Sequence, residues 1–184
     1  MPARYNMAPS QPLPILREPR RLELVRWGLP TSRGIGVNVR LESLYAPAYR
    51  DAFYKRRCLV AVDGFYEWRK EGKRRQPFLV RRTDGKPFAL AGIWQHTTTS
   101  DGEVIDVCAI LTGAAKGVVV PLHDRMPLIV PREAHERWLS HDARAADLRP
   151  LMVSDASTLV SYPVSTFVNS AAHEGPECSE PLPA

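Results

Sequence analysis

The chain has 184 residues, 44% of them hydrophobic, with a formal net charge of +5 and an isoelectric point of about 9.3. This length fits one domain with a sizeable core, and the hydrophobic content excludes a disordered chain. No apolar run approaches a membrane span, and the first residues lack the pattern of a signal peptide. The sequence therefore predicts a soluble, cytoplasmic, monomeric protein with no membrane contact, whose positive charge favours a polyanionic partner.

The three cysteines are an odd number in no metal spacing. Cys58 and Cys108 lie in apolar runs and are expected to be core thiols in a reducing compartment, whereas Cys178 is expected to be exposed. The sequence contains no Gly-rich phosphate loop, no Gly-x-Ser-x-Gly elbow, no His-Glu-x-x-His and no Cys-x-x-Cys. It therefore predicts no cofactor and no metal.

The first third of the chain predicts short strands and one helix. Strands are expected over 22–27 and 37–42, where apolar and polar residues alternate, and a short strand is expected over the apolar residues 14–16. The stretch 28–36 is rich in Gly, Pro, Ser and Thr and predicts a loop. Helical spacing predicts a helix over 45–57.

Three polar residues, Asn38, Arg40 and Glu42, would share one face of the strand 37–42. Such a face is either solvated or the lining of a groove, and the spacing alone leaves both readings open.

A central apolar run over residues 57–62 predicts a buried strand, which Asp63-Gly64 interrupts as a turn or bulge would. Glu67 follows directly, between Tyr66 and Trp68. A carboxylate held between aromatic rings at a strand end is partly desolvated, which raises its pKa toward the range of proton transfer near neutral pH. The alternative is a strand whose Glu67 points to water.

The rest of the chain continues the pattern of short strands and turns. Further strands are expected over 77–82, 87–94, 104–112 and 162–169, a charged hairpin loop over 70–76, and short helices over 133–139 and 143–152. The sequence therefore predicts an α+β fold: a single domain over 1–170 with a mostly antiparallel, barrel-like sheet and flanking helices, followed by a mobile tail over 171–184.

His123 precedes Asp124, Arg125 and Pro127, which indicates a turn rather than an apolar face. Histidine is the side chain best matched to proton transfer near neutral pH. Together with Asn38 and Glu67, it forms a candidate catalytic set from three separate segments.

Several motifs, in this order, resemble those of the SOS response-associated peptidase (SRAP) family: Arg4-Tyr5-Asn6-Met7-Ala8-Pro9, Trp27-Gly28-Leu29, Asn38-Val39-Arg40-Leu41-Glu42, Arg57-Cys58-Leu59, Gly64-Phe65-Tyr66-Glu67-Trp68, Gln76-Pro77-Phe78, Ala91-Gly92-Ile93-Trp94 and His123-Asp124-Arg125-Met126-Pro127. The resemblance extends from about Arg4 to Asn169. It implies a basic channel for single-stranded DNA, fork-like junctions included, and a site for the open-chain aldehyde of an abasic deoxyribose.

The resemblance implies catalytic roles for Asn38, Glu67 and His123. By that analogy Asn38 orients the nucleophile and the sugar, Glu67 handles protons, and His123 helps to open the sugar ring. The implied DNA-binding residues are Arg40, Tyr66, Thr112, Arg125, Met126 and Pro127. The two arginines would hold phosphates, and the apolar groups would pack against a base or sugar.

The chain differs from the pattern of this family in two places. Family members begin Met-Cys-Gly-Arg, and the amine and thiol of that Cys close a thiazolidine with the aldehyde. This chain begins Met1-Pro2-Ala3, so the nucleophile and the segment that carries it are expected to be missing. The second departure lies in the loop 28–36, where Pro30-Thr31-Ser32-Arg33 replaces a stacking Trp of many relatives and leaves Arg33 as a phosphate contact.

Three explanations of the missing Cys stay open: a start codon placed too far downstream, a truncation that binds abasic DNA without crosslinking it, and replacement chemistry through the secondary amine of Pro2. The leading hypothesis is an abasic-site sensor of the DNA damage response. The alternatives are a non-catalytic single-stranded DNA-binding module and a thiol autopeptidase. We expect Asn38, Glu67 and His123 to converge on one small cavity that opens onto a cationic trough.

Overall fold

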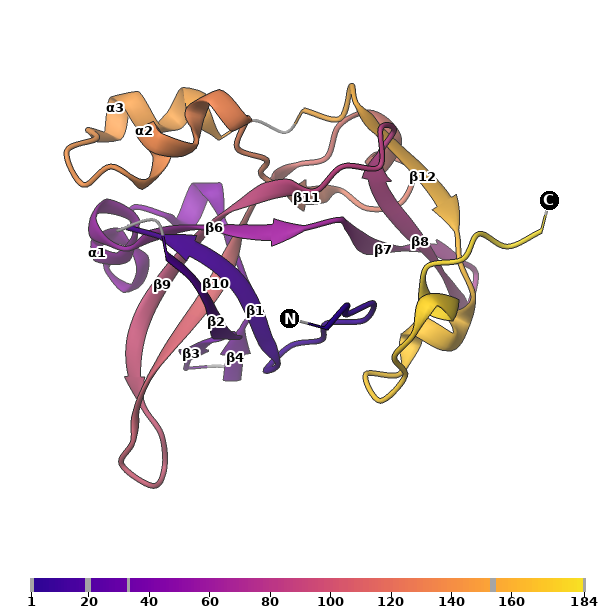
Figure 1. The fold of residues 1–184 in the computed structure, drawn as a ribbon, viewed down its shortest axis with the longest axis horizontal. Helices are drawn as coiled ribbons and strands as arrows, with labels where there is room; N and C mark the ends of the chain where they lie inside the picture. Colours follow the sequence, from indigo (N-terminus) through magenta and orange to yellow (C-terminus); the bar gives the residue numbers. More distant parts are fainter. Residues whose placement is uncertain (1, 19–20, 33, 153–154, 184) are drawn as a thin grey trace.

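A closed barrel lies at the centre of the computed structural model, which describes residues 2–18, 21–32, 34–152 and 155–183 (Figure 1). Its strands are β1 (Pro12–Arg17), β2 (Arg21–Trp27), β6 (Arg57–Val62), β9 (Phe88–Thr98) and β10 (Val104–Ala114). They follow the order β10-β2-β1-β6-β9, and β9 pairs again with β10 to close the barrel. Only β2 and β10 pair in parallel among these neighbours, so the predicted mostly antiparallel, barrel-like α+β domain is confirmed.

The barrel interior is filled by alternate side chains from all of these strands. The buried members are Leu13, Ile15, Val25, Cys58, Val60, Leu90, Cys108 and Ile110. The interior is tightly packed at Gly92, because a Cβ atom at this position would lie only 2.9 Å from Cys58 Sγ. Cys58 and Cys108 are core thiols as predicted, and burial raises the pKa of each.

A second antiparallel sheet, of order β12-β8-β7, continues from the barrel. Its strands are β7 (Gly64–Glu71), β8 (Arg74–Arg82) and β12 (Leu159–Pro163). The predicted break at Asp63-Gly64 is only a bend between β6 and β7, so Glu67 lies inside a strand and not at a strand end. The predicted strand 162–169 is also too long: the sheet ends at Pro163, and a 3-10 helix follows at Thr166–Asn169.

Two short strands extend β10 beyond the barrel, β5 (Asn38–Arg40) and β11 (Arg125–Pro127). The predicted strand 37–42 therefore ends at Arg40, and a 3-10 turn follows at Leu41–Ser43. The predicted loop 28–36 is instead a small hairpin of β3 (Leu29–Thr31) and β4 (Gly34–Gly36). The predicted phosphate contact Arg33 lies outside the described residues.

Three α-helices pack on the outer face of the barrel: α1 (Pro47–Lys55), α2 (His135–Leu139) and α3 (Ala145–Leu148). The fully buried side chains of Phe53 and Trp138 anchor this layer. Arg57 at the start of β6 joins it to the barrel, because its guanidinium donates to four backbone carbonyls at 2.6–2.7 Å, those of Phe53, Tyr54, Trp138 and Ser140. The remaining 3-10 turns are Gly117–Val119, Arg132–Ala134, Arg149–Leu151 and Pro176–Cys178.

The segment after Asn169, expected to be a mobile tail, packs against the start of the chain. The Asn6 amide donates to the carbonyls of Val168, Ser170 and His173 at 2.9–3.1 Å. Glu174 in turn accepts from the Asn6 backbone N–H at 3.1 Å. Cys178 is fully buried rather than exposed, since it packs with Val164 and Val168. Within the described residues, no helix is long and apolar enough to span a membrane.

Candidate functional site

Three strands form a platform beyond the rim of the barrel, with β10 between β5 and β11. Their register places Arg40, Thr112 and Pro127 in one cross-strand row. Asn38 lies two residues before Arg40 and pairs with Ile110. Asn38 and Arg40 are both exposed, so the predicted polar face of this segment is open to solvent.

Glu67 lies on the face of β7 that is turned toward the loop of His123. Its direct cross-strand partner is Phe78, which shares a buried cluster with Leu122 and Met126 of that loop. Tyr66 and Trp68 point to the opposite face because strand side chains alternate, and their own rings are 6.4 Å apart. The predicted position of Glu67 between these two rings is therefore wrong, although the predicted desolvation is present.

Burial raises the pKa of Glu67 to about 7. A positive charge on His123 and the backbone N–H of Trp68 lower this pKa, and the carboxylate of Asp124 raises it further. Glu67 and His123 are therefore electrostatic neighbours, although Glu67 lies in β7 and His123 lies in the turn before β11. At neutral pH such a carboxyl group can either donate or accept a proton.

His123 lies in the turn before β11 and is exposed. Its Nδ1 accepts the Arg125 backbone N–H at 3.0 Å, which fits a neutral ring with the proton on Nε2. The same Nδ1 lies 3.1 Å from Asp124 Oδ1 and 3.2 Å from the Arg125 carbonyl, which would accept from a protonated Nδ1. Both protonation states of the ring thus find a partner without movement of the backbone, as a proton shuttle needs.

Arg125 is not a free cation. Its guanidinium forms a bidentate ion pair with Glu42 at 2.9 and 2.8 Å and also donates to the Thr112 carbonyl at 2.7 Å. This pair lowers the pKa of Glu42 to about 2. Arg125 therefore links the 3-10 turn after β5 to the strand that follows His123, and a phosphate would have to compete with Glu42 for it. Arg40, in contrast, is exposed and forms no ion pair with any described residue.

The other residues implied to bind DNA are more buried. Met126 is fully buried in the cluster behind Glu67, and Thr112 is only 7% exposed. Tyr66 donates its hydroxyl to the Tyr5 carbonyl at 2.7 Å, and burial raises its pKa. These side chains support the platform and the chain start. Pro127 is buried as well and occupies the end of the cross-strand row.

Asn38 and Arg125 lie at different positions along β10. Four residues of β10 separate its partner Ile110 from Ala114, the partner of Arg125, which corresponds to about 13 Å of strand. A substrate of nucleotide size would span that interval. The convergence of Asn38, Glu67 and His123 on one small cavity stays a prediction, because His123 lies in the turn before β11 and outside the strand register.

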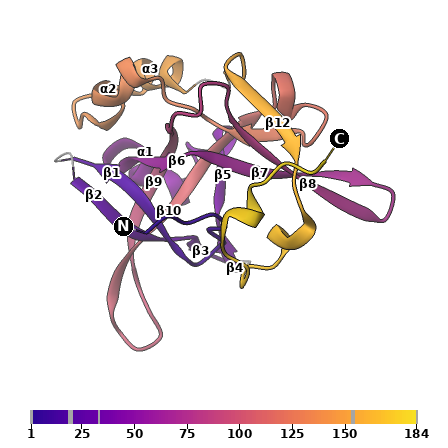
Figure 2. The same ribbon diagram turned by 45° about the vertical axis from the view of Figure 1, so that its right-hand side comes forward.

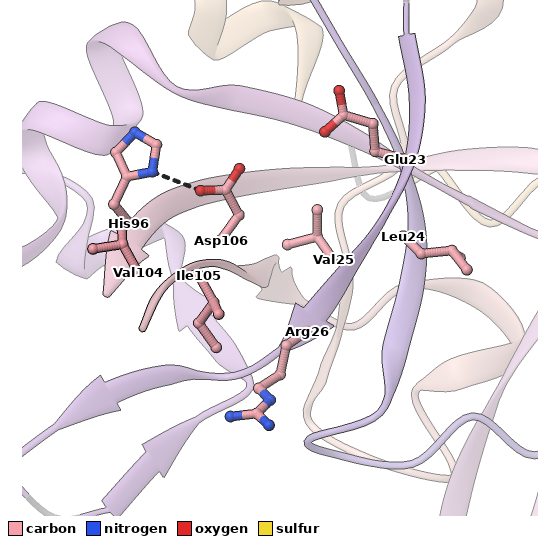
Figure 3. A pocket seen from close by; sticks show the side chains of 8 residues that line it. All are labelled: Glu23, Leu24, Val25, Arg26, His96, Val104, Ile105 and Asp106. Carbon is pink, nitrogen blue, oxygen red and sulfur yellow. Dashed lines mark hydrogen bonds and ion pairs between the residues drawn. The ribbon is translucent and has the colours of Figure 1, made fainter. Parts of the chain in front are cut away.

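A hollow of about 610 Å³ lies elsewhere, at the other end of β10 (Figure 3). Its lining residues are Glu23, Leu24, Val25, Arg26, His96, Val104, Ile105 and Asp106. His96 Nδ1 lies 2.6 Å from Asp106, and Arg17 joins Asp106 to Glu23. Asp106 and Thr112 are six residues apart on β10, or about 20 Å of strand, so this hollow belongs to the opposite barrel end and not to the site of Glu67.

The ion pair of Glu42 with Arg125 is not predicted from the sequence, which places Glu42 on the face of Asn38 and Arg40 without a partner. One signal for such a partner was available in the sequence. An unpaired carboxylate among residues that bind phosphates would repel DNA, so Glu42 needs a cation beside it.

The chain is similar to a known protein family over most of its length. The family described as "SOS response associated peptidase (SRAP)" matches residues 1–171. The abasic site processing protein YoqW of Bacillus subtilis is 33% identical, with 96% of this chain and 85% of that protein covered. The abasic site processing protein YedK of Escherichia coli is 29% identical, with 97% and 85% covered.

Solved structures resemble the fold as well. A crystal structure of a protein from Bordetella bronchiseptica has a TM-score of 0.76 at 28% identity, with 86% of each chain covered. One from Bacteroides thetaiotaomicron has a TM-score of 0.82 at 23% identity, with 94% of this chain and 82% of that chain covered. The latter bears on the fold alone.

Proposed function

The chain belongs to the SOS response associated peptidase (SRAP) family, and we propose that it binds abasic sites in single-stranded DNA and moves protons at the abasic sugar through Glu67 and His123. The observation that carries this proposal is the pairing of a half-buried carboxyl group of pKa about 7 with an exposed imidazole. Abasic site processing is the activity that the relatives' names state.

The chemistry of an abasic deoxyribose needs such a pair. The closed sugar is a hemiacetal, and opening it removes a proton from its hydroxyl and adds one to the ring oxygen. A carboxyl group and an imidazole can exchange the roles of acid and base between successive steps. If an amine then attacks the aldehyde, the resulting carbinolamine loses water to form an imine, and the departing hydroxyl needs a proton again.

Asn38 and Arg40 would hold the substrate along β5. Asn38 offers an amide donor and acceptor on the exposed platform, where it would orient the sugar. Arg40 is the platform cation with no ion pair among the described residues, so it is the better phosphate contact of the two proposed arginines. We assign Arg125 mainly the positioning of His123, through its backbone N–H and its ion pair with Glu42.

The covalent step proposed from the family resemblance is a thiazolidine crosslink through an N-terminal Cys. It needs an amine and a thiol on one residue. Cys58, Cys108 and Cys178 are internal and buried, so none of them offers both groups. The Glu67–His123 pair would serve the imine step whichever residue supplies the amine.

The test compares two proteins on single-stranded DNA with one abasic nucleotide. The 184-residue chain is expected to bind without a heat-stable adduct. A chain extended upstream to a Met-Cys start is expected to form one, and Cys→Ala at that position should abolish it. In the extended chain, Glu67→Gln and His123→Ala should each slow adduct formation by about 10²–10⁴-fold with little change in affinity. Unchanged rates in both variants would remove these residues from the mechanism.

A non-catalytic DNA-binding module is the second candidate, and the absence of any adduct from the extended chain would favour it. Binding would then depend on salt, and Arg40→Gln should reduce the dependence of log K on log salt by about 0.7, the value for one phosphate contact on a single strand. Arg40 is exposed and forms no ion pair with any described residue, which supports this expectation for both candidate functions.

A further inference from the structure

The strand that carries Glu67 continues into a positively charged hairpin that projects from the body of the protein (Figure 2). The hairpin tip, residues 69–75, joins β7 to β8 through a two-residue turn with Gly72 at φ +59°, as in a type II′ turn. Its side chains are all exposed. It contains five basic residues and one acidic residue, a net charge of +4 in a chain of net charge +5.

Most of this charge has no counter-ion. Arg69 pairs with Glu71, and its guanidinium also stacks over the Phe78 ring at 4.6 Å. The other cations form no ion pair with any described residue: Lys70, Lys73, Arg74 and Arg75. Lys70 and Arg75 are directly opposite one another in the register. Like charges in that position destabilise a hairpin, and an anion bound between them would relieve the repulsion.

The tip also has a defined distance from the proposed site. Lys70 lies three positions after Glu67 on β7, with its side chain on the opposite face, and Gly72 lies five positions after Glu67, which corresponds to about 10 and 17 Å of strand. A DNA strand in the helical geometry of a duplex places one phosphate about every 3.4 Å along the helix axis. On a strand of that stacked geometry, an abasic nucleotide at Glu67 would therefore bring the phosphates about three to five nucleotides away to the tip.

We propose that the hairpin tip is a second DNA-binding element, which holds the phosphate backbone on one side of the abasic nucleotide, about three to five nucleotides from it. This inference rests on the proposed function, because it uses Glu67 as the position of the abasic sugar. The tip contributes no base recognition, since flexible lysines and arginines on an exposed turn bind phosphates as charges.

The experiment measures the affinity of Lys70→Gln/Arg75→Gln for abasic DNA by fluorescence anisotropy at several salt concentrations. Three single-stranded substrates are used: one with two nucleotides on each side of the lesion, and two with ten nucleotides on only the 5′ or only the 3′ side. Loss of two phosphate contacts should weaken binding about 25-fold at 0.1 M salt and reduce the salt slope by about 1.4. We expect this loss on one long-flank substrate and not on the short one. Replacing the effective flank by a duplex should raise the change in slope to about 1.8.

The matched control is Arg21→Gln/Arg26→Gln, which removes two exposed charges from β2 at the opposite side of the molecule (Figure 2). It should lose less than the hairpin variant on every substrate. An equal loss in the two variants, or an equal loss on short and long DNA, would show a general charge effect and overturn the inference. Normal binding by the hairpin variant would overturn it too. If the unaltered chain fails to prefer abasic DNA, the proposed function itself is wrong, and the inference fails with it.

Discussion

Replacing Glu67 by Gln tests whether the site contains a desolvated carboxyl group. Gln has nearly the shape of a protonated Glu but cannot ionise. Burial raises the pKa of Glu67 in the folded protein to about 7 from an ordinary value of 4.5. Between these two pH values the folded protein binds more protons than the unfolded chain, so stability falls as the pH rises.

The magnitude follows from the displacement of the pKa. Each unit is equivalent to about 1.4 kcal/mol, so the ionised carboxylate costs the folded state at most about 3 kcal/mol above pH 7. Below pH 4.5 the group is protonated in both states and costs nothing. Glu67→Gln should therefore match the unaltered protein at pH 4 and be more stable than it at pH 8, by up to about 3 kcal/mol.

Urea unfolding from pH 4 to pH 9, followed by tryptophan fluorescence, measures this difference. Glu71→Gln removes a carboxylate from the exposed end of the same strand. It therefore measures how much stability changes when one exposed charge is lost. A stability difference between Glu67→Gln and the unaltered protein that stays constant across this range would refute the reasoning. The reasoning would also be refuted if Glu67→Gln were less stable than the unaltered protein at pH 8 but not at pH 4. That result would mean that the neighbours of Glu67 stabilise its carboxylate form.

Three further predictions concern the frame around the site. Asn6→Ala removes a buried amide that contacts three carbonyls and should destabilise the protein by about 2 kcal/mol, which urea unfolding would detect; an effect below about 0.5 kcal/mol would contradict the anchoring role. Arg57→Met leaves four backbone carbonyls without their donor and should cost about 3–5 kcal/mol, measured in the same way. Cys58, Cys108 and Cys178 are buried, and burial raises the pKa of each thiol, so none should react with a thiol reagent until the chain is unfolded. Rapid labelling of the native protein would show that one of them is accessible.

Most of the strands could be predicted because their signals are local. Alternation over 22–27 and the apolar runs at 57–62 and 104–112 indicate strands whatever the rest of the chain does. The predictions failed where a neighbour decides the structure. The loop 28–36 pairs with itself as β3 and β4, and Cys178 in a Pro- and Glu-rich segment is covered by Val164 and Val168 from earlier in the chain.

The residue types of the candidate site were also visible in the sequence, but their surroundings were not. Desolvation of Glu67 was predicted from the wrong neighbours, because a break at Asp63-Gly64 was expected to end the strand. Arg125 was expected to be free for a phosphate, and its pairing with Glu42 depends on β10 lying between β5 and β11. Such pairings join residues far apart in the chain, and no local pattern encodes them.

Composition and motif order were enough to indicate one basic α+β domain of the SRAP family, because alternation, turn residues and net charge are properties of short stretches or of the whole chain. Closure of the barrel through β9 and β10 was decided only in three dimensions, as was the approach of His123 to Glu67. The pKa of a carboxyl group depends on what excludes water from it and which charges face it, and the folded chain alone supplies both.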